Sequence, residues 1–407
     1  MKNRFKISGP GVLIAAAFIG PGTVTVCTLA GVTHGYTLLW AMVLSVVATI
    51  VLQEMAARIG LISGQDLATV IRQQIPGKSS RFFAILLMLC AIVIGNAAYE
   101  AGNISGGVLG LESLGFDATI GWGNYYINGW SFILGGLAAV LLYVGNYKIL
   151  ERVLVAMVLV MSIAFLITAA LTRPDIWAIF KGSLWPQIPE NGLLMVVAIV
   201  GTTVVPYNLF LHASLVNERW KGKAHLAAAK RDTVVAVILG GIVSMAIMIC
   251  AAALQGTQIS NASDLALSLE PLFGDYARYF VGVGLGAAGL TSAITAPLAA
   301  AYVVQGCLGW KPNLKGVKFR AVWMSILGIG IIFSSSGYKP IQIIQFAQVA
   351  NGVLLPVMAG YLIWLANKKQ VLGSYVNTKV QNILGICIWC IVLILGLRLI
   401  FKVLGIL

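Results

Sequence analysis

The chain has 407 residues, of which 59% are hydrophobic and 10% are charged, whereas an average soluble domain is about 25% charged. This composition excludes a water-soluble globular protein. Because apolar stretches of about 20 residues recur along the chain, it predicts an all-α polytopic membrane protein. The net charge of +14 does not indicate nucleic-acid binding, since the basic residues lie in short loops between the apolar stretches.

The apolar stretches predict one transmembrane domain, 1–407, with two five-helix repeats at about 11–172 and 191–366 and an extra helix at about 380–404. The predicted helices, in chain order, span about 11–33, 37–60, 81–110, 129–147, 150–172, 191–217, 233–254, 277–307, 319–335, 341–366 and 380–404. Most of the 27 Lys and Arg residues lie in loops that are predicted to be on the same side of the membrane as the N-terminus. The positive-inside rule therefore predicts a cytoplasmic N-terminus, and we expect an integral protein of a bacterial inner membrane.

The first predicted span is interrupted at Gly20-Pro21-Gly22-Thr23, and the sixth is interrupted at Val205-Pro206-Tyr207. Pro and Gly interrupt a helix and leave backbone N–H and C=O groups without hydrogen-bond partners, which lipid cannot provide. Such breaks therefore persist only beside protein or a water-filled cavity. The breaks occupy corresponding positions in the two five-helix halves. Paired breaks of this kind predict a LeuT-type inverted-repeat transporter that binds its substrate at mid-membrane.

Six regions, two of which contain the breaks, carry a resemblance to one family of this architecture, the NRAMP proton-coupled divalent metal transporters. They are 9–11 with 17–23; 39–40, Gln53, 56–60 and 64–67; Leu150-Glu151; 201–212; 289–295; and Gln348 with Pro356. In the family, the first helix carries GPG…DPGN, and the sixth carries MPHN followed by a second histidine. The resemblance implies the LeuT-type fold and a metal site formed by the Asp and Asn of DPGN, the Met of MPH, and carbonyls beside the breaks.

This sequence departs from the family at those ligand positions. Gly20 replaces the Asp, Thr23 the Asn, Val205 the Met, and Tyr207 the first histidine. A transition-metal site needs imidazole, thiolate or thioether ligands, usually with a carboxylate. A dication at mid-membrane without a nearby carboxylate is poorly compensated. We therefore assign no metal ligands from the sequence, and the pattern disfavours Mn²⁺ or Fe²⁺ transport.

The remaining groups favour a small zwitterionic or anionic organic solute as the substrate. Backbone amides at a glycine break suit a carboxylate, and a tyrosine offers both an aromatic face and a hydroxyl. Two alternatives stay open: a transporter of divalent metal ions (Mg²⁺ or Mn²⁺) of the NRAMP type, and an uncoupled or channel-like relative. The predicted substrate-binding residues are Ala17, Gly20, Gly22, Thr23, Thr202, Val205, Tyr207, Asn208 and Gln348.

Two ionisable residues inside predicted spans, Glu100 and His212, are the candidates for coupling transport to H⁺, with Na⁺ coupling as the alternative. The alternative roles are a hydrogen-bonded buried acid and a helix-packing histidine. Glu54 and Arg58, four residues apart, predict a salt bridge. The six cysteines lie in or next to apolar spans and are expected to be free. No catalytic motif is present, so we expect neither an enzyme nor a cofactor.

Overall fold

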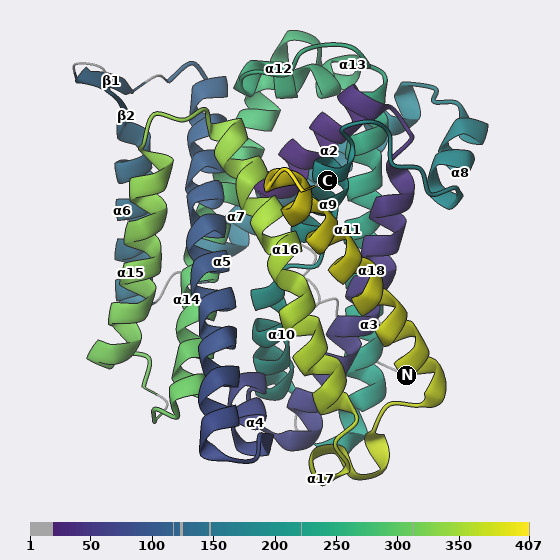
Figure 1. Cartoon of the computed structure of the whole chain (residues 1–407). Coiled ribbons are helices and arrows are strands. Elements are labelled where there is room, and N and C mark those ends of the chain that lie inside the picture. The colour runs from purple at the N-terminus through teal and green to yellow at the C-terminus, as the bar shows by residue number, and fades with distance from the viewer. Residues whose placement is uncertain are drawn as a thin grey trace, which may run out of the picture.

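The computed structural model describes residues 19–116, 118–122, 125–145, 148–220, 222–311 and 313–406, and it is largely helical (Figure 1). The helices of the first half are α2 (Pro21–His34), α3 (Leu39–Ser63), α4 (Leu67–Gln74), α5 (Lys78–Ser113), α6 (Gly129–Val144), α7 (Lys148–Leu171) and α8 (Ile176–Leu184). Strands β1 (Thr119–Trp122) and β2 (Tyr125–Asn128) form an antiparallel hairpin between α5 and α6.

The helices of the second half are α9 (Leu193–Thr203), α10 (Pro206–Arg219), α11 (Leu226–Ala252), α12 (Ala262–Ala266), α13 (Glu270–Phe273), α14 (Ala277–Leu308), α15 (Val317–Ser334), α16 (Pro340–Ala366), α17 (Lys369–Leu372) and α18 (Lys379–Val403). Four short 3-10 turns join them, η1 (Lys223–His225), η2 (Leu267–Leu269), η3 (Gly274–Tyr276) and η4 (Gly373–Tyr375).

The predicted spans from the second onward each coincide with a helix or, for the sixth, with the pair α9 and α10. Nine spans within the described residues are long and apolar enough to cross a membrane, and α6 is a shorter apolar helix. One boundary was wrong: α11 begins at Leu226 rather than near 233. Its first two turns contain Lys230 and Arg231 among alanines, so they form helix without looking like membrane-spanning sequence. The division into two repeats stays a prediction.

Helix α5 lies at the centre of the bundle and packs against α14, α15 and α16. Its glycines allow these close approaches. A Cβ at Gly106 would overlap Pro21 of α2, and a Cβ at Gly110 would meet the backbone of Gly286 on α14. Large apolar side chains such as Val160 and Ile332 are instead exposed on the outer surface of the bundle, as a lipid-facing surface requires.

The predicted Glu54–Arg58 salt bridge is confirmed, with Arg58 Nε 3.1 Å from Glu54 Oε1. The same guanidinium donates to the Tyr375 carbonyl and to Asn377 Oδ1, both at 2.6 Å. It therefore joins α3 to the segment before α18 in addition to forming the ion pair. All six cysteines are free, as the sequence predicted.

Candidate functional site

The breaks in the first and sixth spans meet at one place in the bundle. Helix α2 begins at Pro21, with Gly20 as its N-cap in an extended conformation. Helix α9 ends at Thr203, and α10 begins at Pro206 after Val205, which is also extended. Proline fits the first position of a helix because its missing N–H would have no partner there. The half of the first span before residue 19, including the predicted site residue Ala17, lies outside the described residues.

Two threonine hydroxyls connect the breaks. Thr23 Oγ1, in the first turn of α2, lies 3.0 Å from Thr202 Oγ1, in the last turn of α9. Both side chains are buried, although the sequence separates them by 179 residues. The structure thus brings together one predicted site residue from each break.

Gln348 of α16 packs directly onto both broken helices. A Cβ at Gly22 would overlap the Gln348 amide, and a Cβ at Gly201 would overlap the Gln348 backbone carbonyl. The side chain is 1% exposed, and its Oε1 has no hydrogen-bond partner. An unpartnered buried amide oxygen is uncommon in a folded protein and calls for a ligand or a water. Gln348 therefore adds an unpaired oxygen, able to accept a hydrogen bond or to bind a cation, from a third helix at the breaks.

Tyr207, in the first turn of α10, closes one side of this junction. Its ring packs edge-on against Tyr99 of α5, with centroids 5.3 Å apart, and its hydroxyl is in side-chain hydrogen-bonding range of Thr295 on α14. The side chain is 2% exposed. Asn208, the next residue, is 8% exposed, and its backbone N–H donates to the Val205 carbonyl at 3.1 Å. The two predicted residues thus complete the turn that starts α10.

Glu100 is fully buried next to Tyr99 in the middle of α5. Its Oε2 accepts a hydrogen bond from Asn103 Nδ2 at 3.2 Å, and its Oε1 has no partner. The methylene groups of Glu100 rest on Gly330 of α15, where a Cβ would overlap them. Among the described residues, no Lys, Arg or His forms an ion pair with this carboxyl group.

His212 faces away from the breaks, toward α11. Its Nε2 lies 2.9 Å from Thr233 Oγ1, and that hydroxyl donates to the Ala229 carbonyl at 2.9 Å. A threonine hydroxyl has one proton, so the histidine Nε2 is the donor and carries the ring proton. Nδ1 then has no partner. The structure thus places this second coupling candidate against α11, whereas Glu100 packs against α15.

Sequence analysis missed Asn351, one turn after Gln348 on α16. It is 2% exposed, its Nδ2 has no partner, and its Oδ1 lies near Gly95 of α5. The signal was present in the sequence as Gln345, Gln348 and Asn351 at a spacing of three residues. That spacing places the three amides along one face of a helix.

Gln345, the first of these three amides, lines a cavity near the breaks. The cavity has a volume of about 610 Å³, and His34, Met195, Lys339 and Gln345 are among its lining residues. It lies between the C-terminal end of α2 and the N-terminal ends of α9 and α16. We call it the outer cavity. Since Gln345 precedes Gln348 by one turn, the outer cavity approaches the breaks along α16.

The donors gathered at the breaks are hydroxyl and amide oxygens. In the part of the chain that the structure describes, no three His, Cys, Asp or Glu side chains come together as a metal-binding group. The carbonyl end of α9 adds the negative end of a helix dipole to these neutral oxygens, and this end attracts cations.

Interrupted helices that meet at polar breaks inside a bundle are the arrangement of the LeuT-type fold. Solved structures support this fold. A manganese transporter from Eremococcus coleocola is 20% identical, with a TM-score of 0.74 over 96% of this chain and 85% of that chain. MhsT, solved in complex with L-phenylalanine, is 16% identical, with a TM-score of 0.59 over 98% of this chain and 99% of that one.

The particular family follows from sequence comparison. A family model described as natural resistance-associated macrophage protein-like matches residues 11–402, and the chain belongs to this family. A relative from Yersinia pestis (strain Pestoides F), named "Divalent metal cation transporter MntH", is 28% identical over 99% of this chain and 96% of its own length. A relative of the same name from Caldanaerobacter subterraneus subsp. tengcongensis is 26% identical over 97% and 93%.

These relatives overturn the prediction of an organic solute as the substrate. That prediction rested on two assumptions. The first was that a site without charged ligands does not bind a metal ion, and the second was that the backbone amides around Gly22 are accessible to a substrate carboxylate. The structure shows that the Gln348 side chain covers Gly22. It also shows that three helices together supply neutral oxygens that the sequence scatters. The alternative, a divalent metal cation, is the one that the relatives favour.

Proposed function

We propose that this chain is a secondary transporter that moves a divalent metal cation across the membrane by alternating access. One observation carries the proposal: the Thr23 and Thr202 hydroxyls meet at 3.0 Å beside the unpartnered Oε1 of Gln348. The carbonyl end of α9 points to the same place and attracts cations. The names of the full-length relatives supply the class of ion.

The donor types favour a hard ion that keeps part of its water shell. Mg²⁺ prefers oxygen ligands and gives up its waters reluctantly, whereas Mn²⁺, Fe²⁺ and other transition metals gain more from imidazole or sulfur. The junction offers two hydroxyls and one amide oxygen. We therefore propose Mg²⁺ as the preferred substrate. Bound waters then hydrogen-bond to Thr23, Thr202 and Gln348.

We assign the coupling proton to Glu100. The carboxyl group is buried without a cationic partner, and it lies close enough to Tyr207 at the second break to interact with its phenol. Loss of its proton would place a negative charge near a bound dication, which is the compensation that the neutral donors lack. His212 stays a second candidate for proton movement, although its ring proton is engaged with Thr233.

The basic residues argue for a cytoplasmic N-terminus in a bacterial inner membrane. Helices α4 and α17 lie at the end of the bundle shown at the bottom of Figure 1, and they contain Arg72 and Lys369. Lys230 lies in the first two turns of α11, and Lys311 lies between α14 and α15. We call this end of the bundle the basic end. Cytoplasmic loops are enriched in Lys and Arg, so this end faces the cytoplasm and the outer cavity opens to the opposite side.

Uptake of Mg²⁺ and Mn²⁺ into proteoliposomes tests the proposed function. We expect uptake of Mg²⁺ that falls at least about tenfold in Gln348→Leu and Thr202→Val, since each removes an oxygen donor worth about 1.4 kcal/mol or more. Thr168→Val is the matched control because its hydroxyl bonds only to the Ala164 carbonyl of its own helix. Mn²⁺ uptake without Mg²⁺ uptake would contradict the choice of ion. Uptake of neither ion by the folded protein would contradict the function.

A further inference from the structure

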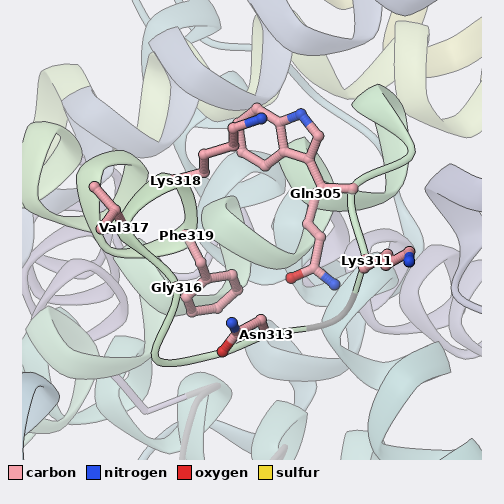
Figure 2. A pocket seen from close by; sticks show the side chains of 8 residues that line it. Gln305, Lys311, Asn313, Gly316, Val317, Lys318 and Phe319 are labelled. Atoms are coloured by element: carbon pink, nitrogen blue, oxygen red, sulfur yellow. The ribbon is translucent and has the colours of Figure 1, made fainter.

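A second pocket lies at the basic end of the bundle, between the end of α14 and the start of α15 (Figure 2). Its volume is about 290 Å³. We call it the basic-end pocket. The residues that carry the argument are Gln305, Lys311, Asn313, Lys318 and Phe319. No acid is among the described residues that line it, so its electrostatic character is positive.

The N-terminus of α15 forms one wall of this pocket. The helix has 18 residues, its N-cap Gly316 provides no side-chain cap, and its first turn contains no acid. Lys318 lies in that first turn, where a positive charge opposes the helix dipole. Free N–H groups and a lysine at a helix N-terminus together make a favourable position for an anion, above all a phosphate.

Gln305 provides an independent indication of a ligand. The side chain is 9% exposed, and its Oε1 has no hydrogen-bond partner. Figure 2 shows its amide group reaching into the pocket toward Asn313 and Phe319. A buried amide oxygen without a donor is destabilising, so the complementary ligand carries a hydroxyl or ammonium group in addition to its anionic part.

Exposed apolar side chains, which we call the apolar rim, occur in the segment that holds the pocket. Val317 lines the pocket and is 84% exposed, and Leu308 and Leu314, which precede it at the end of α14 and in the following loop, are 46% and 52% exposed. Trp310 lies beside them with Lys318 Nζ 5.5 Å from its ring centre. Exposed leucine, valine and tryptophan side chains next to lysines are typical of a segment at the boundary between lipid headgroups and acyl chains.

We propose that the basic-end pocket binds a phosphodiester whose headgroup also carries a hydrogen-bond donor. The phosphate lies at the N-terminus of α15 beside Lys318, and the donor group reaches Gln305 Oε1. Two sources share this chemistry. One is a phospholipid of the adjoining leaflet such as phosphatidylglycerol, whose acyl chains would lie along the apolar rim. The other is a soluble glycerophosphodiester.

Thermal unfolding of the delipidated full-length chain in detergent tests the site. Phosphatidylglycerol, phosphatidylcholine and glycerophosphoglycerol are titrated separately. We expect saturable stabilisation by phosphatidylglycerol and a weaker effect of phosphatidylcholine, whose headgroup has no donor for Gln305. Gln305→Leu and Lys318→Gln should each lower the apparent affinity for phosphatidylglycerol about tenfold, the change for one lost charge-assisted or buried hydrogen bond.

Lys369→Gln is the matched control, because Lys369 is an exposed lysine at the same end of the bundle on α17. It should bind like the unchanged protein. Lys318→Arg keeps the charge and should retain binding, which separates lost recognition from lost folding. Stabilisation by glycerophosphoglycerol alone assigns the site to a soluble ligand, and stabilisation by the lipid alone assigns it to the membrane. Equal affinity for both lipids, unchanged in Gln305→Leu and Lys318→Gln, would overturn the proposal.

Discussion

The two breaks meet at one site but are built from opposite kinds of residue. The first presents bare backbone, so that the Gln348 amide packs on Gly22 and Pro21 packs on Gly106. The second is covered by side chains, with Val205 and Tyr207 each 3% exposed or less. The first break therefore relies on a side chain from a neighbouring helix, Gln348. The second break instead provides the carbonyl end of α9 and the buried side chains of Val205 and Tyr207. Changes on the two sides should therefore have different effects.

The largest effect is expected where the backbones touch. Gly201→Ala places a Cβ on the Gln348 carbonyl, which cannot move without shifting α16. Overpacking of this kind costs about 1–3 kcal/mol, so both thermal stability and uptake should fall. Gly22→Ala is the comparison, because its Cβ meets only the flexible Gln348 amide. It should lose uptake while keeping its unfolding temperature, and equal destabilisation of the two variants would contradict this distinction.

Restoring the family's ligands should change which ion is carried. The triple substitution Gly20→Asp, Thr23→Asn and Val205→Met adds a carboxylate, an amide and a thioether at the junction. Soft and charged ligands favour transition metals, so Mn²⁺ uptake should rise relative to Mg²⁺ uptake. Competition between the two ions in proteoliposomes measures the ratio. An unchanged ratio in a folded variant would show that these positions do not select the ion.

Glu100→Gln tests the proton assignment without changing the size of the side chain. An amide cannot release a proton, so uptake should lose its dependence on an imposed pH gradient while ion binding persists. Measurement of uptake at several external pH values with fixed ion concentration checks this. The matched control is Glu54→Gln, which makes the same change at an acid that is paired with Arg58. A pH response retained by Glu100→Gln would exclude Glu100 as the carrier.

The smallest effect is expected at His212. His212→Gln keeps a donor for Thr233, and the site lies against α11 rather than at the breaks. Uptake and its pH dependence should change less than twofold, a difference of about 0.4 kcal/mol. Loss of the pH response in this variant would instead identify His212 as a coupling residue.

The sequence was sufficient for the helices and for both breaks, because hydrophobic length and Pro–Gly positions are local signals. Through the family resemblance it also proposed Gln348, which the structure places against Gly22 and Gly201. It did not reveal that Gln348 covers Gly22 or that Thr23 and Thr202 touch, since these contacts join α2, α9 and α16 across long separations. The substrate prediction failed for this reason: it counted charges at each break separately, whereas the donors belong to three helices at once.

Two pairs of helices around the outer cavity are locked by backbone contact. Gly201 and Gly352 bring α9 and α16 together, and Gly31 packs α2 onto the Met248 carbonyl of α11. Neither pair can slide internally without a steric clash. The outer cavity lies along the seam between these pairs, so its width changes only when one pair tilts against the other. The non-helical residues Gly20 and Val205 are the places where the broken helices can bend, so opening and closing become rigid-body motions rather than local rearrangements.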